Sequence, residues 1–361
     1  MSSFANSKGT NEYKEYMITK KNLPESHFRE FEDLNFTSLG MGTYLGKPNI
    51  ETDKLVENAV IESIENGINV IDTAINYRRQ KSERAIGNAL RKLEQSRFNK
   101  NQFFISSKIG YIPGDADRNL SPKEYIDEIL INGGLVSKKE IINFNCMSIP
   151  YLEHQFNQSL KNLKVDSIDL LYLHNVAESQ KSILGEQKFY EMMMRSFEFL
   201  ESKRADNKLK FYGMATWDCF RVKEISPEYV DLSKITSLAQ TAAEEMGKTK
   251  SGFKFIMLPF NLAMSEAATL KNQNGKTFFE KANELDIGVF TAVPLLQGRL
   301  LNHNKSKELK NKWNLKTTAQ GIIQYVRSYG MPLIAPLIGQ KQSQHVKENL
   351  ELAKLPPQNL K

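Results

Sequence analysis

The sequence predicts an α/β protein in which eight parallel strands, each followed by a helix, close into a barrel. Short, mostly apolar runs alternate with longer segments of helical periodicity, which is the pattern of buried parallel strands joined by helices. Eight such units can be counted, and 361 residues are an ordinary length for one barrel of this kind. Several apolar runs also end in a polar residue, and in such barrels the chemistry takes place at the C-terminal ends of the strands.

The strands are expected at 37–43, 68–74, 103–108, 167–174, 210–216, 254–260, 287–293 and 333–338. The helices are expected at 53–66, 82–95, 150–163, 187–204, 220–246, 265–285, 317–329 and 343–354. Thr52 and Ser82 are plausible N-caps of the first two helices, and Gly67 is a plausible helix stop. The order of these units predicts a (β/α)8, or TIM, barrel.

Two segments lie outside this alternation. Residues 1–33 are expected to form an N-terminal extension, partly disordered, with a strand or hairpin that caps the barrel floor, and residues 34–361 are expected to form the barrel. Residues 109–149 are inserted between the third strand and its helix. Because long loops at this end of a barrel lie over the active site, we expect this insertion to act as a lid. The alternative is a stabilising excursion that does not contact substrate.

The composition favours a cytoplasmic protein with a sizeable core. Cys146 and Cys219 are too few for a disulfide scaffold or a structural zinc site. The polar N-terminus lacks the apolar segment of a signal peptide, and no stretch approaches the roughly 20 apolar residues of a membrane span. The net charge is +7, but acids and bases are interleaved, so neither nucleic acid nor membrane is an expected partner. The dense basic stretch 302–312 is interpreted as a solvated loop, or alternatively as a region that attracts an anionic dinucleotide.

Polar residues near the ends of three apolar runs form a candidate catalytic set. NVIDTAINY contains Asp72 and ends with Tyr77, FFISSK ends with Lys108, and SIDLLYLH ends with His174. At strand ends of one barrel, these side chains would point into one pocket. A buried Lys108, held by Asp72, would lower the pKa of the Tyr77 phenol, which could then exchange a proton with a carbonyl or alcohol oxygen near neutral pH. His174 would orient that oxygen. A buried Lys–Asp pair alone is weak evidence of function, but the joint placement favours catalysis.

At these residues the chain resembles the aldo-keto reductase superfamily. The resemblance implies a (β/α)8 barrel that reduces an aldehyde or ketone, or oxidises the matching alcohol, by hydride transfer with NADP(H) and without a metal. It implies Tyr77 as the general acid or base. The motifs that carry it follow the family order over about residues 34–354 and are GMGT (40–43), DTAINY (72–77), SERAIGNAL (82–90), SSK (106–108), IDLLYLH (168–174), PLLQGRL (294–300) and LIGQKQSQHVKEN (337–349).

The resemblance also implies where the adenine half of the cofactor binds. Lys341 stands where the family places a cation for the 2′-phosphate, and Gln342 takes the next contact position. His345 takes the position that covers the adenine face, and Glu348 and Asn349 match residues that bond its amino edge. These residues open a helix, whose N-terminus offers free N–H groups and a positive dipole end to phosphate.

Further cofactor contacts are expected from backbone groups. GMGTYLG (40–46) has a glycine spacing one residue too long for a dinucleotide fingerprint, and no acid follows at the right distance, so these glycines more simply end the first strand close to the cofactor. The loop at 294–300 matches one whose backbone N–H groups lie over the pyrophosphate. The remaining expected cofactor residues are Gly42, Thr43, Thr216, Leu295, Gln297, Gly298, Leu300 and Gly339.

The nicotinamide half departs from the family pattern. Ala215 and Thr216 stand where a Ser-Asn pair is common, Met257 stands where a glutamine is usual, and Ala292 stands where a tyrosine usually stacks on the ring. Thr216 can still donate one hydrogen bond. Losing two or three hydrogen bonds to a buried amide would weaken binding by about 2–4 kcal/mol.

Two interpretations follow from this departure. In the first, other groups hold the ring, with Phe260 or Phe290 as a possible aromatic face, and the enzyme works normally. In the second, the barrel is catalytically weak and acts as a nucleotide-sensing or regulatory interaction protein. The complete catalytic set favours the first. Tyr44, Tyr111 and Trp217 are candidates for the substrate wall, and they suit a sugar face or an apolar carbonyl equally. The oligomeric state stays open.

Overall fold

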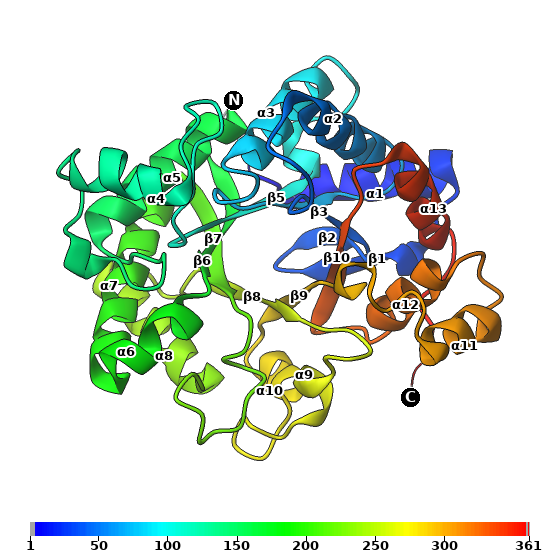
Figure 1. The fold of residues 1–361 in the computed structure, drawn as a ribbon. Helices are drawn as coiled ribbons and strands as arrows, with labels where there is room; N and C mark the ends of the chain where they lie inside the picture. Colours follow the sequence, from blue (N-terminus) through cyan, green and yellow to red (C-terminus); the bar gives the residue numbers. More distant parts are fainter. Residues whose placement is uncertain (1–3, 359, 361) are drawn as a thin grey trace.

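The computed structural model describes residues 4–358 and residue 360. In this part of the chain, eight parallel strands close into a barrel in the order β10-β3-β4-β5-β6-β7-β8-β9, with helices around it (Figure 1). This barrel confirms the predicted fold class. Its strands are β3 Gly40–Gly42, β4 Val70–Asp72, β5 Phe104–Ile109, β6 Ile168–His174, β7 Leu209–Ala215, β8 Phe253–Pro259, β9 Gly288–Ala292 and β10 Leu333–Gly339.

Helices connect the strands and form the outer layer of the barrel (Figure 1). The longer ones are α2 Ile50–Glu65, α3 Lys81–Leu93, α5 Ile149–Leu163, α7 Glu186–Ala205, α8 Leu232–Glu245, α10 Phe278–Glu284, α11 Asn304–Lys312, α12 Thr318–Arg327 and α13 Ser343–Ala353. Shorter helical segments are α6 Ser182–Leu184, α9 Glu266–Thr269, η2 Lys100–Gln102, η5 Ala177–Lys181 and η6 Leu296–Gly298.

Two predicted helices, 220–246 and 265–285, are wrong in extent. The first begins only at α8, because Asp231 caps that helix by accepting a backbone N–H of its first turn. The second is divided into α9 and α10 by a tight turn in which Asn274 and Gly275 have φ of 53° and 79°. Asparagine and glycine tolerate this left-handed region, so local turn chemistry overrode the helical periodicity.

The predicted helix caps are shifted by two or three positions. Asn49, and not Thr52, caps α2, and its side chain accepts the backbone N–H of Thr52 at 3.1 Å. Gln80, and not Ser82, precedes α3, with a left-handed φ of 72°. Gly67 does follow the end of α2, where its φ of 115° turns the chain toward β4.

The N-terminal extension closes one end of the barrel. A hairpin lies across this end, and the ring of Phe36 lies 5.0 Å from Phe104 and 6.0 Å from both Phe255 and Phe290, between their centroids. These rings belong to one buried cluster inside the barrel, so the expected hairpin at the floor is confirmed. The extension contains α1 Ser7–Lys21, η1 Glu25–His27 and β1 Phe28–Phe31, and the hairpin is completed by β2 Leu34–Thr37, which lies beyond the expected boundary at residue 33.

The disorder expected within residues 1–33 is not found in the described part, 4–33. Helix α1 is tied to the barrel because the backbone N–H of Ala5 donates to the buried carboxylate of Asp169 at 2.7 Å. The buried hydroxyl of Tyr13 donates to the carbonyl of Ile64 at 2.7 Å. Burial of apolar residues on one side of α1 therefore fixes a segment whose polar composition suggested mobility.

The insertion at 109–149 packs around a small core of its own. Its short helical segments are α4 Pro122–Tyr125, η3 Ile126–Ile131 and η4 Lys138–Glu140. Ile112, Leu120, Leu130 and Val136 are buried together in this core. Tyr111 of this insertion lines a cavity at the C-terminal ends of the barrel strands. The insertion is thus present as expected, and its action as a lid stays a prediction.

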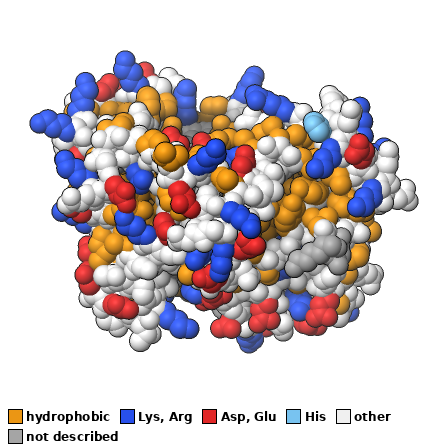
Figure 2. Space-filling model, turned by 90° about the horizontal axis from the view of Figure 1, so that it is seen from below, with side chains coloured by type: hydrophobic (Ala, Val, Ile, Leu, Met, Phe, Trp, Pro, Cys, Tyr) orange, Lys and Arg blue, Asp and Glu red, His pale blue; other side chains and the backbone are white. Residues whose placement is uncertain are grey.

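Charged side chains of both signs are interspersed over the side of the molecule drawn in Figure 2. The basic stretch 302–312, expected to be a loop, forms helix α11 over most of its length. Within the described residues, no helix is long and apolar enough to cross a membrane.

Candidate active site

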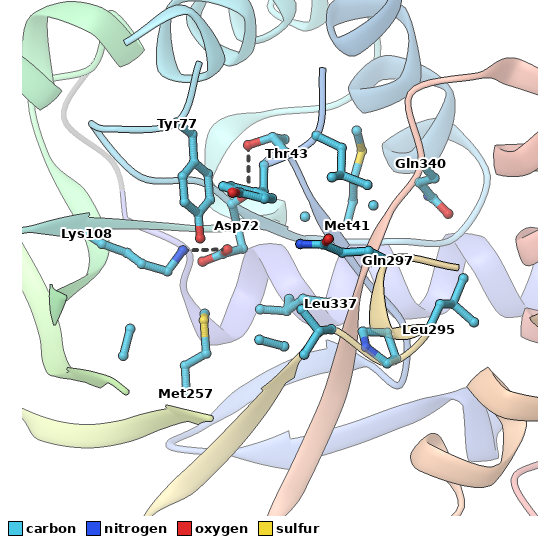
Figure 3. A pocket seen from close by; sticks show the side chains of 18 of the residues that line it. Met41, Thr43, Asp72, Tyr77, Lys108, Met257, Leu295, Gln297, Leu337 and Gln340 are labelled. Atoms are coloured by element: carbon cyan, nitrogen blue, oxygen red, sulfur yellow. Dashed lines mark hydrogen bonds and ion pairs between the residues drawn. The ribbon is translucent and has the colours of Figure 1, made fainter. Parts of the chain in front are cut away.

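A cavity of about 650 Å3 opens where the barrel strands end. The four predicted catalytic residues all line it. Asp72 ends β4, Tyr77 lies in the following loop, Lys108 lies in β5, and His174 ends β6. The fold therefore brings together the side chains that the sequence placed at separate strand ends. Figure 3 shows three of them, Asp72, Tyr77 and Lys108.

An ion pair between Asp72 and Lys108 forms the base of the site. Lys108 Nζ lies 2.7 Å from Asp72 Oδ2 and donates to the carbonyl of Thr73 at 2.7 Å. The hydroxyl of Ser106 donates to Asp72 Oδ1 at 2.7 Å. Burial raises the pKa of Asp72 and lowers that of Lys108, but the neighbouring charges outweigh burial at the lysine, whose pKa ends above its usual value. Lys108 is therefore held as a cation in the interior.

The phenol of Tyr77 lies against this cation, with Lys108 Nζ 4.6 Å from the ring centroid. Burial raises the pKa of Tyr77 above its usual value of 10.0, and the positive charge of Lys108 opposes this rise without cancelling it. In the protein without a bound cofactor, the pKa of Tyr77 is therefore raised, and the expected lowering is wrong. The sequence shows the lysine but not the extent to which the phenol is buried. The phenol is protonated at neutral pH.

A strained turn follows Tyr77 directly. Arg78, Arg79 and Gln80 have φ of 51°, 53° and 72°, which is the left-handed region that side chains other than glycine rarely adopt. The guanidinium of Arg78 is paired with Asp53 of α2. On the other side, the carbonyl of Arg79 and the side chain of Gln80 bond to the backbone of the 109–149 insertion, each at 3.1 Å. The insertion thus braces the loop that carries Tyr77.

His174 completes the set beside Tyr77. The two ring centroids are 6.0 Å apart, and the centroid of the Tyr111 ring lies 5.8 Å from that of the imidazole. Burial, together with the nearby charge of Lys108, lowers the pKa of His174 well below its usual value. The imidazole is therefore neutral at physiological pH, and it can donate one N–H hydrogen bond to an oxygen in the cavity.

The far end of the cavity carries most of the residues expected to hold a dinucleotide. Lys341, Gln342 and His345 line it at the start of α13, where Gln342 is the N-cap residue. A helix N-terminus with a lysine beside it suits phosphate. The other expected cofactor residues that line the cavity are Gly42, Thr43, Thr216, Leu295, Gln297, Gly298 and Gly339.

Three expected cofactor residues do not line the cavity. Leu300 is buried, with 4% of its surface exposed. Glu348 accepts a hydrogen bond from Thr317 Oγ1 at 2.5 Å, and Asn349 is buried and donates to Gln340 Oε1 at 2.9 Å. These two polar side chains join α13 to its neighbours, so their contact with adenine stays a prediction.

The part of the cavity away from α13, where the nicotinamide is expected, is lined by apolar side chains. Ala215 and Met257 are each 3% exposed, and Ala292 lines the cavity next to them. The hydroxyl of Thr216 donates to the carbonyl of Met257 at 3.3 Å, so its proton is already engaged. The structure thus places these residues together as expected. Apart from the Thr216 hydroxyl oxygen, which can still accept a hydrogen bond, their side chains offer no hydrogen-bonding group to an amide.

Several lining residues were not identified from the sequence. Met41, Leu337 and Gln340 also line the cavity (Figure 3). Met41 and Gln340 contact Ser63 of α2, so their place at the cavity depends on how the helix packs against the barrel. Asn76 and Asn175 line the cavity as well. The last two are direct neighbours of Tyr77 and His174, and this adjacency was a signal that could have found them.

Comparisons with known proteins agree with this architecture. The sequence model of the aldo/keto reductase family matches residues 38–360. An aldo/keto reductase from Klebsiella pneumoniae, solved in complex with NADP and acetate, is 17% identical with a TM-score of 0.60, and the match covers 91% of this chain and 90% of that chain. An aldo-keto reductase from Bacillus halodurans in its holo form is 17% identical with a TM-score of 0.61, covering 92% of each chain.

A glycerol dehydrogenase from Gluconobacter oxydans is also 17% identical, with a TM-score of 0.64 and coverage of 94% of this chain and 92% of that chain. At these identities the structural similarity shows a shared fold. The family match extends over nearly the whole barrel. The chain belongs to the aldo/keto reductase family.

Proposed function

We propose that this chain is an NADP-dependent oxidoreductase that reduces an aldehyde or ketone to an alcohol. The observation that carries the proposal is the arrangement of Asp72, Tyr77, Lys108 and His174 at one end of a single cavity, with Lys341 at the other. This arrangement offers a proton donor where a carbonyl oxygen would lie, and a cation where a phosphate would lie.

The protein supplies the proton of the reaction. Reduction adds a hydride to the carbonyl carbon and a proton to the carbonyl oxygen, and the protonated phenol of Tyr77 is the donor of that proton. Lys108, fixed by Asp72, stabilises the phenolate left behind, which regains its proton from water. The neutral imidazole of His174 donates a hydrogen bond that orients the carbonyl oxygen. The phenol of Tyr77 is protonated at neutral pH, which is the state that proton donation to a carbonyl oxygen requires.

The cavity fits a dinucleotide at one end and fits it poorly at the other. The reduced nicotinamide of NADPH supplies the hydride when it is bound. Lys341 and the N-terminus of α13 would hold the 2′-phosphate, His345 would cover the adenine, and the backbone around Gln297 and Gly298 would lie over the pyrophosphate. Related structures from Klebsiella pneumoniae, solved with NADP or NADPH, support this choice of cofactor.

Turnover with a panel of aldehydes and ketones tests the proposal. The purified protein is mixed with NADPH and each carbonyl compound, and loss of the reduced cofactor is followed by absorbance, with alcohol formation confirmed by chromatography. Reduction of at least one carbonyl that depends on the protein is expected. NADPH that binds without being consumed by any compound of the panel would contradict the proposal.

The apolar ring subsite favours one second candidate, a nucleotide-sensing barrel without turnover. Ala215, Met257 and Ala292 provide no group for the carboxamide, which would leave the ring loosely placed. Binding of NADPH together with a complete absence of turnover would support this candidate. We favour the enzyme because a sensor has no use for a phenol held against a buried lysine.

A further inference from the structure

One wall of the cavity is held by a single polar anchor. Residues 44–48, the 44–48 loop, connect β3 with the start of α2, and the first two of them line the cavity. Within residues 4–358 and 360, the backbone of this loop takes part in one hydrogen bond, in which Arg78 Nε donates to the carbonyl of Lys47 at 3.0 Å. Arg78 Nη2 also donates to the carbonyl of Asn49, directly after the loop, at 3.4 Å. The loop therefore depends on one guanidinium for its position.

The Arg78 guanidinium is itself rigidly placed. Its side chain is 1% exposed and is paired with the carboxylate of Asp53 in α2. A buried cation needs such a partner, and the planar fork of arginine can reach a carboxylate and carbonyl groups at the same time. Asp53 Oδ2 lies 3.1 Å from Lys81 Nζ as well. Because Lys81 would still balance Asp53, removal of Arg78 would not leave a buried carboxylate alone.

The 44–48 loop contacts the catalytic end of the cavity through Tyr44. This residue lines the cavity together with Tyr111 and Trp217, the other two aromatic residues expected there. The centroid of the Tyr44 ring lies 5.0 Å from that of Tyr77. Arg78 follows Tyr77 directly in the strained turn, so the residue that anchors the loop is joined covalently to the catalytic phenol.

The same loop reaches the end of the cavity where the phosphate is expected. A Cβ added at Gly339, the last residue of β10, would lie 3.3 Å from Leu45 Cδ1, so the leucine packs against that strand end. A Cβ added at Gly46 would lie 3.5 Å from Lys341 Cδ and 3.6 Å from Arg78 Nε. The aliphatic stem of Lys341 and the guanidinium of Arg78 are therefore neighbours of one point in the loop.

We propose that Arg78 is a positioning residue that fixes the 44–48 loop against Tyr77 and against the Lys341 end of the cavity at once. It acts through the loop and through its chain neighbour, and not by contact with substrate. A loop that is ordered before the cofactor arrives spares the ligand the cost of ordering it. A phenol held in place meets the carbonyl oxygen in a productive geometry. The inference rests on the proposed reductase function.

Arg78→Gly tests the proposal, because glycine keeps the left-handed backbone without strain and removes only the guanidinium. The fragment 2′-phospho-ADP-ribose would then have to order the loop as it binds, so its Kd, measured by calorimetry, should rise about three- to tenfold. The kcat with saturating NADPH should fall about tenfold through a less well placed phenol. A purely structural role would lower the number of binding sites per chain that calorimetry reports, and would leave the Kd of those sites unchanged.

Two further variants separate positioning from backbone and charge effects. Arg79→Gly places the same glycine one residue later, where φ is also left-handed at 53°, and leaves the guanidinium of Arg78 in place. It should change the Kd of the fragment and kcat much less than Arg78→Gly does. Arg78→Lys keeps a cation for Asp53 but lacks the planar fork that reaches the carbonyls of Lys47 and Asn49. It should retain the stability of the wild-type protein and still raise the Kd and lower kcat.

Three results would overturn the proposal: an unchanged Kd in Arg78→Gly, equal changes in Arg78→Gly and Arg79→Gly, or wild-type Kd and kcat in Arg78→Lys. If Arg78→Gly does not fold, the Kd and kcat of Arg78→Lys decide. A wild-type protein that reduces no carbonyl of the panel would refute the proposed function, and the calorimetric Kd values alone would then decide on Arg78.

Discussion

Replacing Met257 by glutamine is expected to tighten binding of whole NADP(H) without changing binding of its adenine half. Figure 3 shows the Met257 side chain in the cavity below the Asp72–Lys108 pair. Methionine and glutamine are both unbranched and similar in length, so the new amide fits the same space. The carbonyl of Met257 already accepts the N–H of Thr216 at 2.8 Å and its hydroxyl at 3.3 Å, which fixes the strand at this point.

The expected gain is that of one hydrogen bond to the nicotinamide carboxamide, about 0.5–1.5 kcal/mol, or roughly a two- to tenfold lower Kd. The fragment 2′-phospho-ADP-ribose lacks the ring, so its Kd should stay unchanged. Calorimetry on both ligands measures the two values. Met246→Gln, at the exposed end of α8, is the matched control and should change neither Kd.

In the wild-type protein, the fragment is expected to bind about as tightly as whole NADP, because the apolar floor adds little to the affinity. A wild-type protein that binds whole NADP a hundredfold more tightly than the fragment would refute this reasoning. The ring would then be held by groups other than the side chains of Ala215, Met257 and Ala292.

Three further outcomes are expected. Lys341→Ala should weaken NADPH by about 1.5–3 kcal/mol and NADH much less, which fluorescence titration of both cofactors would show, and equal losses would contradict its role at the 2′-phosphate. Lys108→Met should lower the free energy of unfolding by about 3–5 kcal/mol at neutral pH. In this variant the buried Asp72 carboxylate has lost its cation, so its pKa in the folded state lies above its pKa in the unfolded state. Asp72 therefore takes up a proton as the pH falls, and the loss of stability should shrink. Denaturant unfolding measured across pH checks the sign. Gln80→Gly keeps the left-handed backbone but removes the hydrogen bond to the insertion. Because the Tyr77 side chain would then be held less firmly in position, kcat should fall while the Kd of NADPH stays constant.

The barrel and its strand ends were predictable because the information is local. The runs before Asp72, Lys108 and His174 are apolar enough to require burial, and a parallel sheet places their ends together. The predicted helix bounds were wrong where turn residues determine the path of the chain. Asn274 and Gly275, for example, divide one predicted helix into two.

The electrostatics and the outer contacts of the site depend on tertiary packing and were not predictable. The sequence shows that Lys108 can stabilise a phenolate, but the rise in the pKa of Tyr77 comes from burial by elements far apart in the chain. Glu348 and Asn349 have the residue types expected at the adenine edge, yet their side chains bond to Thr317 and Gln340. The insertion braces the turn that follows Tyr77, a contact that the sequence did not indicate, and its action as a lid stays a prediction.

The central claim is that the phenol of Tyr77 gives its proton to the substrate, and Tyr77→Phe tests it most directly. The variant removes one hydroxyl from the cavity and should leave the fold and the Kd of NADPH unchanged. Losing the general acid should lower kcat by about 10²–10⁴-fold for every carbonyl that the wild-type protein reduces. A variant that binds NADPH normally and retains near-wild-type kcat would contradict the assignment of Tyr77 as the proton donor.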